Sequence, residues 1–145
     1  MTKMQKRIYP KNPLIGVGAA VFKDSSVLLI KRGNPPLYGS WSLPGGRAKP
    51  DENLEEAVKR EVNEECGIKI DVVDLVKLFE YIEKGDGGNI KFHYIVFDFN
   101  AVYNSGTLTH TSDAHDSQWV ELEELHQFEL TDAVIDVIKK GEISS

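Results

Sequence analysis

The segment from Gly45 to Ile68 constrains the fold of this chain more than any other, because its second half has a helical pattern with helix-ending signals on both sides. Asn53 is a favourable N-cap residue, and Glu56, three residues later, completes a capping-box pattern. Gly67 is a usual helix stop. Apolar residues recur at the spacing of one helix face, at Leu54, Ala57, Val58 and Val62. We therefore predict a helix between Asn53 and Gly67.

Three glutamates do not fit a plain amphipathic helix. At about 100° per residue, Glu61 and Glu65 project from the same side as the apolar stripe, and Glu64 lies at its edge. Carboxylates on that side are costly to bury, and at these spacings they repel one another. Arg60 is the only cation within easy reach. A hard divalent cation such as Mg²⁺ would resolve the conflict, since it takes carboxylate and carbonyl oxygens as ligands. A solvated acidic helix is the alternative that the helix alone leaves open.

The spacing of the fixed residues resembles the Nudix box of the Nudix hydrolases, the family that includes MutT. The matching positions are Gly46, Glu52, Arg60-Glu61-Val62, Glu64-Glu65 and Gly67-Ile68. Every fixed position of the motif holds a permitted residue. At a variable position, Asp51 stands where many members carry glycine. The resemblance extends, less specifically, from about Leu14 to Lys140, so it covers most of the chain.

This resemblance implies a fold of the α/β (α+β) class, a Nudix-like α/β/α sandwich with a mixed central sheet and the box helix packed against it. It also implies binding of Mg²⁺, or of Mn²⁺ in its place, by Glu61, Glu64, Glu65 and the Gly46 carbonyl. By the same resemblance, Glu52 is a secondary ligand or braces the loop, and Arg60 orients the carboxylates.

The general base of the reaction is left open between a box glutamate and an acid from a separate loop. Glu64 is the candidate in the box, and Asp113 and Asp116 are the candidates in a predicted polar loop at 112–116. A base must lie within hydrogen-bond reach of the attacking water, and the sequence does not place these three side chains relative to one another.

Four further residues are candidates for contact with substrate. Arg32 follows a predicted strand, and Arg47 ends the segment 43–47, which we predict as a strand end running into a turn at Gly45-Gly46. Guanidinium groups suit phosphate oxygens. Trp41 either packs under the sheet or stacks on a base. Tyr94 either lines a base pocket or belongs to the core.

The expected activity is hydrolysis of the pyrophosphate bond of a nucleoside diphosphate linked to another group, with an ADP-ribose-like substrate favoured. An alternative is a nucleoside triphosphate pyrophosphohydrolase that cleans the nucleotide pool. A non-catalytic nucleotide-sensing module is an alternative of another class, disfavoured because the box carboxylates and Arg60 are all present. RNA-end processing would need a basic track for the RNA, which this acidic chain lacks after residue 11.

Length, charge and composition limit the domain organisation, the binding partners and the cellular location expected for this chain. Its 145 residues suit one domain, which we place at 14–145 after an N-terminal arm at 1–13. The formal charge of −6 argues against binding of nucleic-acid polymers. No apolar run approaches the length of a membrane span or a signal peptide, and the single cysteine cannot form an internal disulfide, so a cytoplasmic protein without membrane contact is expected. The family resemblance also makes a homodimer plausible.

The other elements follow from periodicity and turn residues. We predict strands at 15–22, 27–30, 68–83 (as one or two strands), 90–102, 107–111 and 118–120, and turns at 85–89 and 104–106. A short helix is expected at 122–125. A last helix should begin after an N-cap at Thr131 and end at Gly141.

Overall fold

The computed structural model describes residues 8–32, 39–109 and 114–144. Its strands are β1 (Leu14–Lys23), β2 (Ser26–Arg32), β3 (Trp41–Ser42), β4 (Gly45–Arg47), β5 (Ile68–Lys84), β6 (Ile90–Gly106) and β7 (Ala114–Glu121). Its α-helices are α2 (Leu54–Cys66) and α3 (Asp132–Ser144), and its 3₁₀ helices are η1 (Asp86–Gly88) and η2 (Leu122–Gln127). No helix within the described ranges is long and apolar enough to cross a membrane.

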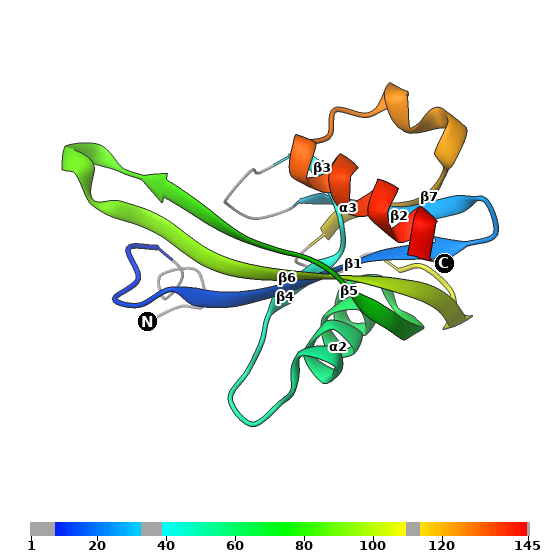
Figure 1. Cartoon of the computed structure of the whole chain (residues 1–145), viewed down its shortest axis with the longest axis horizontal. Helices are drawn as coiled ribbons and strands as arrows, with labels where there is room; N and C mark the ends of the chain where they lie inside the picture. The colour runs from blue at the N-terminus through cyan, green and yellow to red at the C-terminus, as the bar shows by residue number, and fades with distance from the viewer. Residues whose placement is uncertain (1–7, 33–38, 110–113, 145) are drawn as a thin grey trace.

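The strands form one mixed sheet between two helices. The order is β3-β2-β1-β6-β5, with β4 paired to β1 and β7 paired to β2. Strands β1 and β6 run parallel, whereas the other neighbours are antiparallel. Helix α2 covers one face of the sheet and α3 covers the other, as Figure 1 shows. The predicted α/β class with a mixed central sheet is therefore confirmed.

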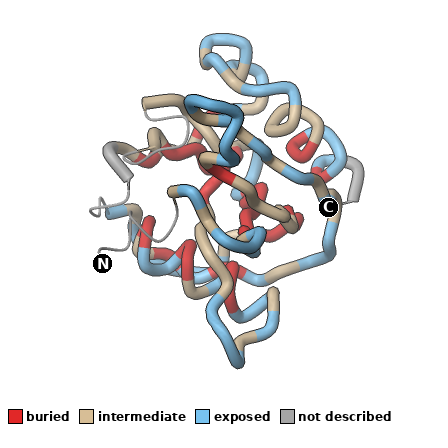
Figure 2. Tube along the Cα trace, turned by 90° about the vertical axis from the view of Figure 1, so that its left-hand side faces the viewer, coloured by how far each residue is buried: buried red, intermediate tan, exposed pale blue. Residues whose placement is uncertain are grey.

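The alternation of β1 divides the core into two halves. Val17, Ala19 and Val21 pack with Ala57, Val58 and Val62 of α2. Ala20 and Phe22 face the other way and pack with Val137 and Ile138 of α3. Successive side chains of a strand point to opposite faces, so a strand covered on both faces is apolar throughout. Figure 2 shows these buried segments at the centre of the molecule.

Helix α2 begins and ends where its local sequence predicts. The Oδ1 of Asn53 accepts a hydrogen bond of 2.8 Å from the backbone N–H of Glu56. Gly67 ends the helix in the left-handed region, with φ +78°, and its N–H donates to the Asn63 carbonyl. Asp51 also has a positive φ, +67°, which explains why glycine suits this loop position. Aspartate tolerates that conformation better than most side chains.

Three predicted features around the connection from β6 to β7 differ from the structure. The turn at 104–106 is instead the end of β6, whose Gly106 pairs with Ile68 of β5. Residues 107–109 are not a strand, and 110–111 lie outside the described residues. Within the predicted polar segment at 112–116, residues 114–116 belong to β7 and pair with β2. Long-range pairing with β5 and β2 overrides the turn-forming residues that the local sequence offers.

The last helix confirms its predicted start and contradicts its predicted end. The Oγ1 of Thr131 accepts a hydrogen bond of 3.3 Å from the backbone N–H of Val134, as an N-cap does. Gly141, however, lies inside α3 and does not end it. A Cβ at Gly141 would lie 2.8 Å from the Phe22 ring. The glycine therefore lets α3 approach β1 closely.

Candidate active site

A cavity of about 410 Å³ lies at the Gly45-Gly46 pair and extends over β1, β6 and β5 to the start of α3. The predicted turn at this pair is wrong, because both glycines belong to strand β4 and pair with β1. Six residues that the sequence singled out line the cavity: Arg32, Gly46, Arg47, Glu61, Glu65 and Tyr94. They come from four different elements, β2, β4, α2 and β6, so only the folded chain brings them together. A cavity of this volume is in the usual range for a small-molecule site.

Two of the box glutamates are buried against the two glycines of β4. Glu61 is 7% exposed and Glu65 is 6% exposed. The Glu61 carboxylate lies directly over the Cα of Gly46, where any Cβ would collide with it. Glu65 accepts a hydrogen bond of 3.0 Å from the backbone N–H of Gly45. Gly46 thus makes room for the Glu61 carboxylate, and Gly45 provides a hydrogen-bond donor to the Glu65 carboxylate.

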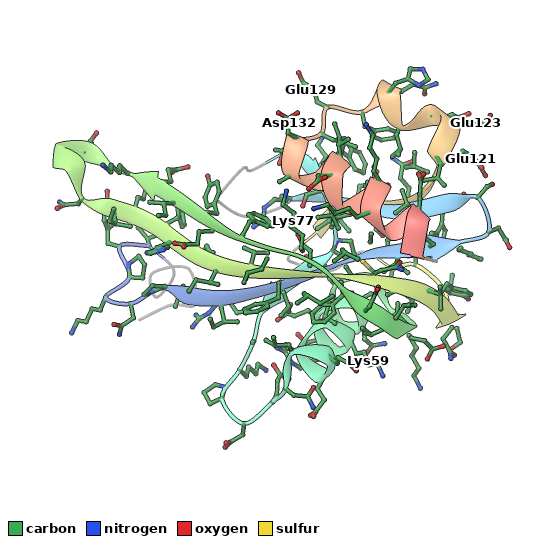
Figure 3. The ribbon with its side chains drawn as sticks, in the orientation of Figure 1. Lys59, Lys77, Glu121, Glu123, Glu129 and Asp132 are labelled. Carbon is green, nitrogen blue, oxygen red and sulfur yellow. The ribbon has the colours of Figure 1, made fainter. Side chains whose placement is uncertain are left out.

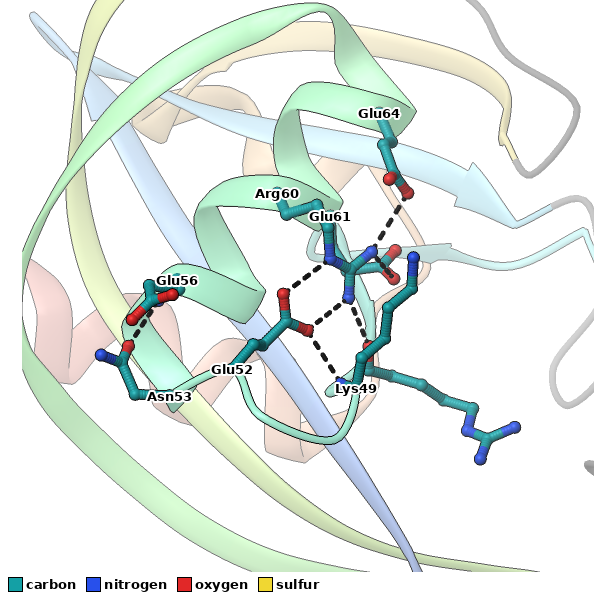
Figure 4. A network of polar contacts seen from close by, with 8 residues as sticks. Lys49, Glu52, Asn53, Glu56, Arg60, Glu61 and Glu64 are labelled. Atoms are coloured by element: carbon teal, nitrogen blue, oxygen red, sulfur yellow. Dashed lines mark hydrogen bonds and ion pairs between the residues drawn. The ribbon is translucent and has the colours of Figure 1, made fainter.

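Arg60 organises the remaining carboxylates, as Figure 4 shows. Its guanidinium binds Glu52 through two hydrogen bonds, of 2.9 Å from Nε and 2.7 Å from Nη2. Its Nη1 donates to Glu61 at 2.8 Å and to Glu64 at 3.1 Å. Its Nη2 also donates to the carbonyl of Arg47 at 2.8 Å. One cation therefore joins the loop before α2 to two box glutamates.

The charges of this network stabilise one another. The hydrogen bonds from Arg60 lower the pKa of Glu52 to about 2, with a further contribution from the backbone N–H of Lys49. The same bond to Glu52, followed by that to Glu61, raises the pKa of the Arg60 guanidinium above its usual value. Bidentate pairing of arginine with a carboxylate is strong and directional. Arg60 does not line the cavity itself, so its role there is to position carboxylates.

Replacing Arg60 with methionine should lower the free energy of unfolding by about 2–3 kcal/mol, because half-buried carboxylates lose their shared cation. Arg60→Met keeps much of the side-chain length and removes all donors. Urea unfolding in the absence of divalent ions measures the loss. Lys59→Met is the matched control, since Lys59 is the exposed neighbour on α2 (Figure 3). An equal loss in both variants would contradict the bracing role of Arg60.

The carboxylate and carbonyl oxygens at this site are ligands that suit a hard divalent cation. Glu61 and Glu64 both reach the same guanidinium nitrogen, so their carboxylates already converge on positive charge. The Glu61 carboxylate occupies the space that the absence of a side chain at Gly46 provides. Within the described ranges, no three His, Cys, Asp or Glu side chains lie together in a metal-binding arrangement. Glu64 turns instead to Arg60 with its side chain 53% exposed, and Glu65 turns to Gly45.

Of the other predicted residues that the structure describes, Asp116 and Trp41 do not line the cavity. Asp116 sits on β7 opposite Lys31, next to Arg32 in the paired strand. Asp113 lies outside the described residues. Trp41 packs edge-on against Phe128, with ring centroids 5.1 Å apart, in the core half under α3. Of its two expected roles, this placement favours core packing.

Several residues of the cavity lining were not predicted from the sequence, among them Phe79, Tyr81 and Asp98. Asp98 is 7% exposed, and burial raises its pKa to about 7, against a lowering by Lys77. Burial also raises the pKa of Tyr81 to about 12, with a further contribution from its hydrogen bond to Glu83. A signal for Asp98 was present, because it follows Tyr94 and Val96 on a strand face that is apolar from Ile90 to Val96.

Known proteins share the fold of this chain, a mixed sheet between two helices. The NUDIX domain model matches residues 12–140, and the chain therefore belongs to the Nudix family. An ADP-ribose pyrophosphatase of Methanocaldococcus jannaschii is 33% identical over 114 residues, which cover 79% of this chain and 65% of that protein. A nucleoside triphosphatase, NudI, of Escherichia fergusonii is 31% identical over 74% of this chain and 81% of its own length.

Among solved structures, a MutT Nudix hydrolase from Burkholderia pseudomallei is 30% identical, with a TM-score of 0.74. The match covers 90% of this chain and 98% of that one. The chain spans less than two thirds of the length of several curated relatives, including the archaeal pyrophosphatase.

Proposed function

We propose that this chain is a divalent-metal-dependent pyrophosphohydrolase of small nucleotides, with ADP-ribose or a similar nucleoside diphosphate derivative as substrate. One observation carries the proposal: a single cavity joins the box carboxylates Glu61 and Glu65 to Arg32 and to aromatic side chains. The carboxylate end suits a metal ion and phosphate, whereas the aromatic end suits a nucleoside. The archaeal ADP-ribose pyrophosphatase supports this choice of substrate.

Each part of the site has a role in this proposal. Glu61, Glu64 and Glu65, with the Gly46 carbonyl, would hold Mg²⁺, which supplies Lewis-acid stabilisation and an activated water. Arg32 and Arg47 would bind phosphate oxygens from the cavity wall. Arg60 keeps the carboxylates oriented, and Glu52 braces the loop. Glu64, Asp113 and Asp116 are the candidates to accept the proton when water attacks phosphorus and the bridging P–O bond breaks.

A second candidate function is hydrolysis of nucleoside triphosphates to monophosphates and pyrophosphate. The similarity to NudI, over 81% of its length, is the observation that favours it. Both activities use the same carboxylates and differ in the group beyond the cleaved bond. A sensing module without turnover is disfavoured, because it would not need all of the box carboxylates with Arg60 between them.

The test is incubation of the purified protein with Mg²⁺ and a panel of compounds, with products identified by chromatography. The panel holds ADP-ribose, other nucleoside diphosphate sugars, dinucleoside polyphosphates and nucleoside triphosphates. We expect AMP and ribose phosphate from ADP-ribose, and no reaction in excess chelator. Monophosphate and pyrophosphate from the triphosphates would favour the second candidate. Saturable binding without turnover of any compound would overturn both in favour of a sensor.

A further inference from the structure

Asp98 is a buried carboxylate in the cavity wall that the proposed hydrolysis does not use. It lies on β6 and is 7% exposed. Strand register places Gly45, Gly18 and Asp98 in one row across the neighbouring strands β4, β1 and β6. Two strand spacings of roughly 4.8 Å put the Asp98 backbone about 10 Å from that of Gly45. Asp98 therefore belongs to the part of the cavity beyond the box carboxylates.

The Asp98 carboxylate has no hydrogen-bond donor among the described residues. Its cross-strand neighbour Lys77 is the cation that acts on it. The Lys77 ammonium, however, binds Asp136 on α3 at 2.7 Å, and Lys77 reaches from β5 toward that helix in Figure 3. Burying a carboxylate without a donor is costly. A group that enters the cavity with an N–H to donate would remove this cost.

The fold leaves space for this carboxylate. On the adjacent strand β1, a Cβ at Gly18 would lie 2.5 Å from Oδ1 of Asp98 and 3.4 Å from the Pro44 carbonyl. Any larger residue at position 18 would push against Asp98. The lack of a side chain at Gly18 thus allows the Asp98 carboxylate to lie at the cavity wall as a hydrogen-bond acceptor.

The surroundings of Asp98 select the kind of group that would bind there. Phe79, Tyr81, Tyr94 and Val96 line the same cavity. Aromatic side chains favour stacking with a flat ring. A phosphate would be repelled by the carboxylate, so the anionic part of a nucleotide is directed to the arginines and the metal-binding end. The flat, uncharged part, the nucleobase, is then the part that meets Asp98.

We propose that Asp98 is a specificity-determining residue that accepts a hydrogen bond from the exocyclic amino group of the substrate's nucleobase. The inference rests on the proposed function, because it assumes that the cavity binds a nucleotide. An amino group stands on the edge of the base, where a carboxylate in the cavity wall can reach it. A site with a buried acceptor discriminates strongly against an analogue that lacks the donor.

Nucleotide pairs that differ only by the amino group test this directly. The pairs are AMP with purine riboside monophosphate, GMP with IMP, and CMP with zebularine monophosphate. Calorimetric binding constants are measured for the wild-type protein, Asp98→Leu and Asp98→Asn, so the result does not depend on turnover. Asp74→Leu, at an exposed position on β5, is the control.

We expect the wild-type protein to bind the amino-bearing member of at least one pair about 10–100-fold more tightly. Asp98→Leu should reduce that ratio to less than about threefold, whereas Asp98→Asn should keep part of it through its amide oxygen. In turnover assays of the matching substrates, the loss should appear in KM and leave kcat little changed. Asp74→Leu should behave as wild type.

Several results would overturn the inference. No preference within any pair, or the same ratio in Asp98→Leu as in wild type, would exclude Asp98 as the residue that recognises the base. If Asp98→Leu weakened the binding of both members of every pair equally, the contact of Asp98 would be assigned to the ribose instead of the base. Failure of the wild-type protein to bind or hydrolyse any nucleotide would overturn the proposed function as well, which distinguishes the two failures.

Discussion

Glu64→Gln is expected to lower kcat by about 10²–10⁴-fold on the best substrate of the panel, with KM little changed. The variant removes a charged ligand or the general base and adds no bulk, so the effect falls on the transition state. The fold should persist, because the Glu64 side chain is 53% exposed and its hydrogen bond with Arg60 can be kept by the amide oxygen. Steady-state kinetics with Mg²⁺ and urea unfolding measure both quantities.

Glu55→Gln is the control for this experiment, since Glu55 lies in the first turn of the same helix and is exposed. Asp113→Asn and Asp116→Asn, assayed in parallel, separate the candidates for the general base. If neither slows the reaction, the base is a box glutamate. Near-normal turnover of Glu64→Gln would remove Glu64 from both the metal-binding and the base assignments.

Asp98→Asn is expected to stabilise the folded protein in a pH-dependent manner. The ordinary pKa of this aspartate is 3.8, and burial raises it to about 7 in the folded state. The unfolded chain therefore loses its proton first as pH rises, which favours unfolding of the wild type. The contribution of Asp98 to the free energy of unfolding of the wild type is fully present below about pH 4. It is completely lost above about pH 7. A gap of about three pKa units corresponds to at most about 4 kcal/mol.

The measurement is urea unfolding of wild type and Asp98→Asn between pH 4 and pH 9. The difference between their unfolding free energies should be small at pH 4, grow with pH and level off above pH 7. Asp74→Asn removes an exposed carboxylate of the neighbouring strand and should show no such trend. A difference that is constant over the whole range would mean that Asp98 ionises normally in the folded protein.

Local sequence was sufficient to predict helix α2 with both of its ends. Asn53 and Gly67 cap through contacts only three or four residues away, so nothing distant decides them. The placement of Glu61 and Glu65 on the buried side also follows from helical periodicity alone, and both are buried. Gly141 shows the limit of local signals. The same residue type that ends α2 serves in α3 as a close contact with Phe22 on another element.

The sequence by itself determined the family, the helix that carries the glutamates and the types of donor available to a metal ion. These features depend on residue type at short, fixed spacings. Only the tertiary structure decided which residues share a cavity with that helix. The parallel pairing of β1 with β6 brings Asp98 beside Gly18, eighty residues earlier, and the packing of Phe128 draws Trp41 into the core. Such contacts depend on strand register and helix packing across the whole chain, which local periodicity does not encode.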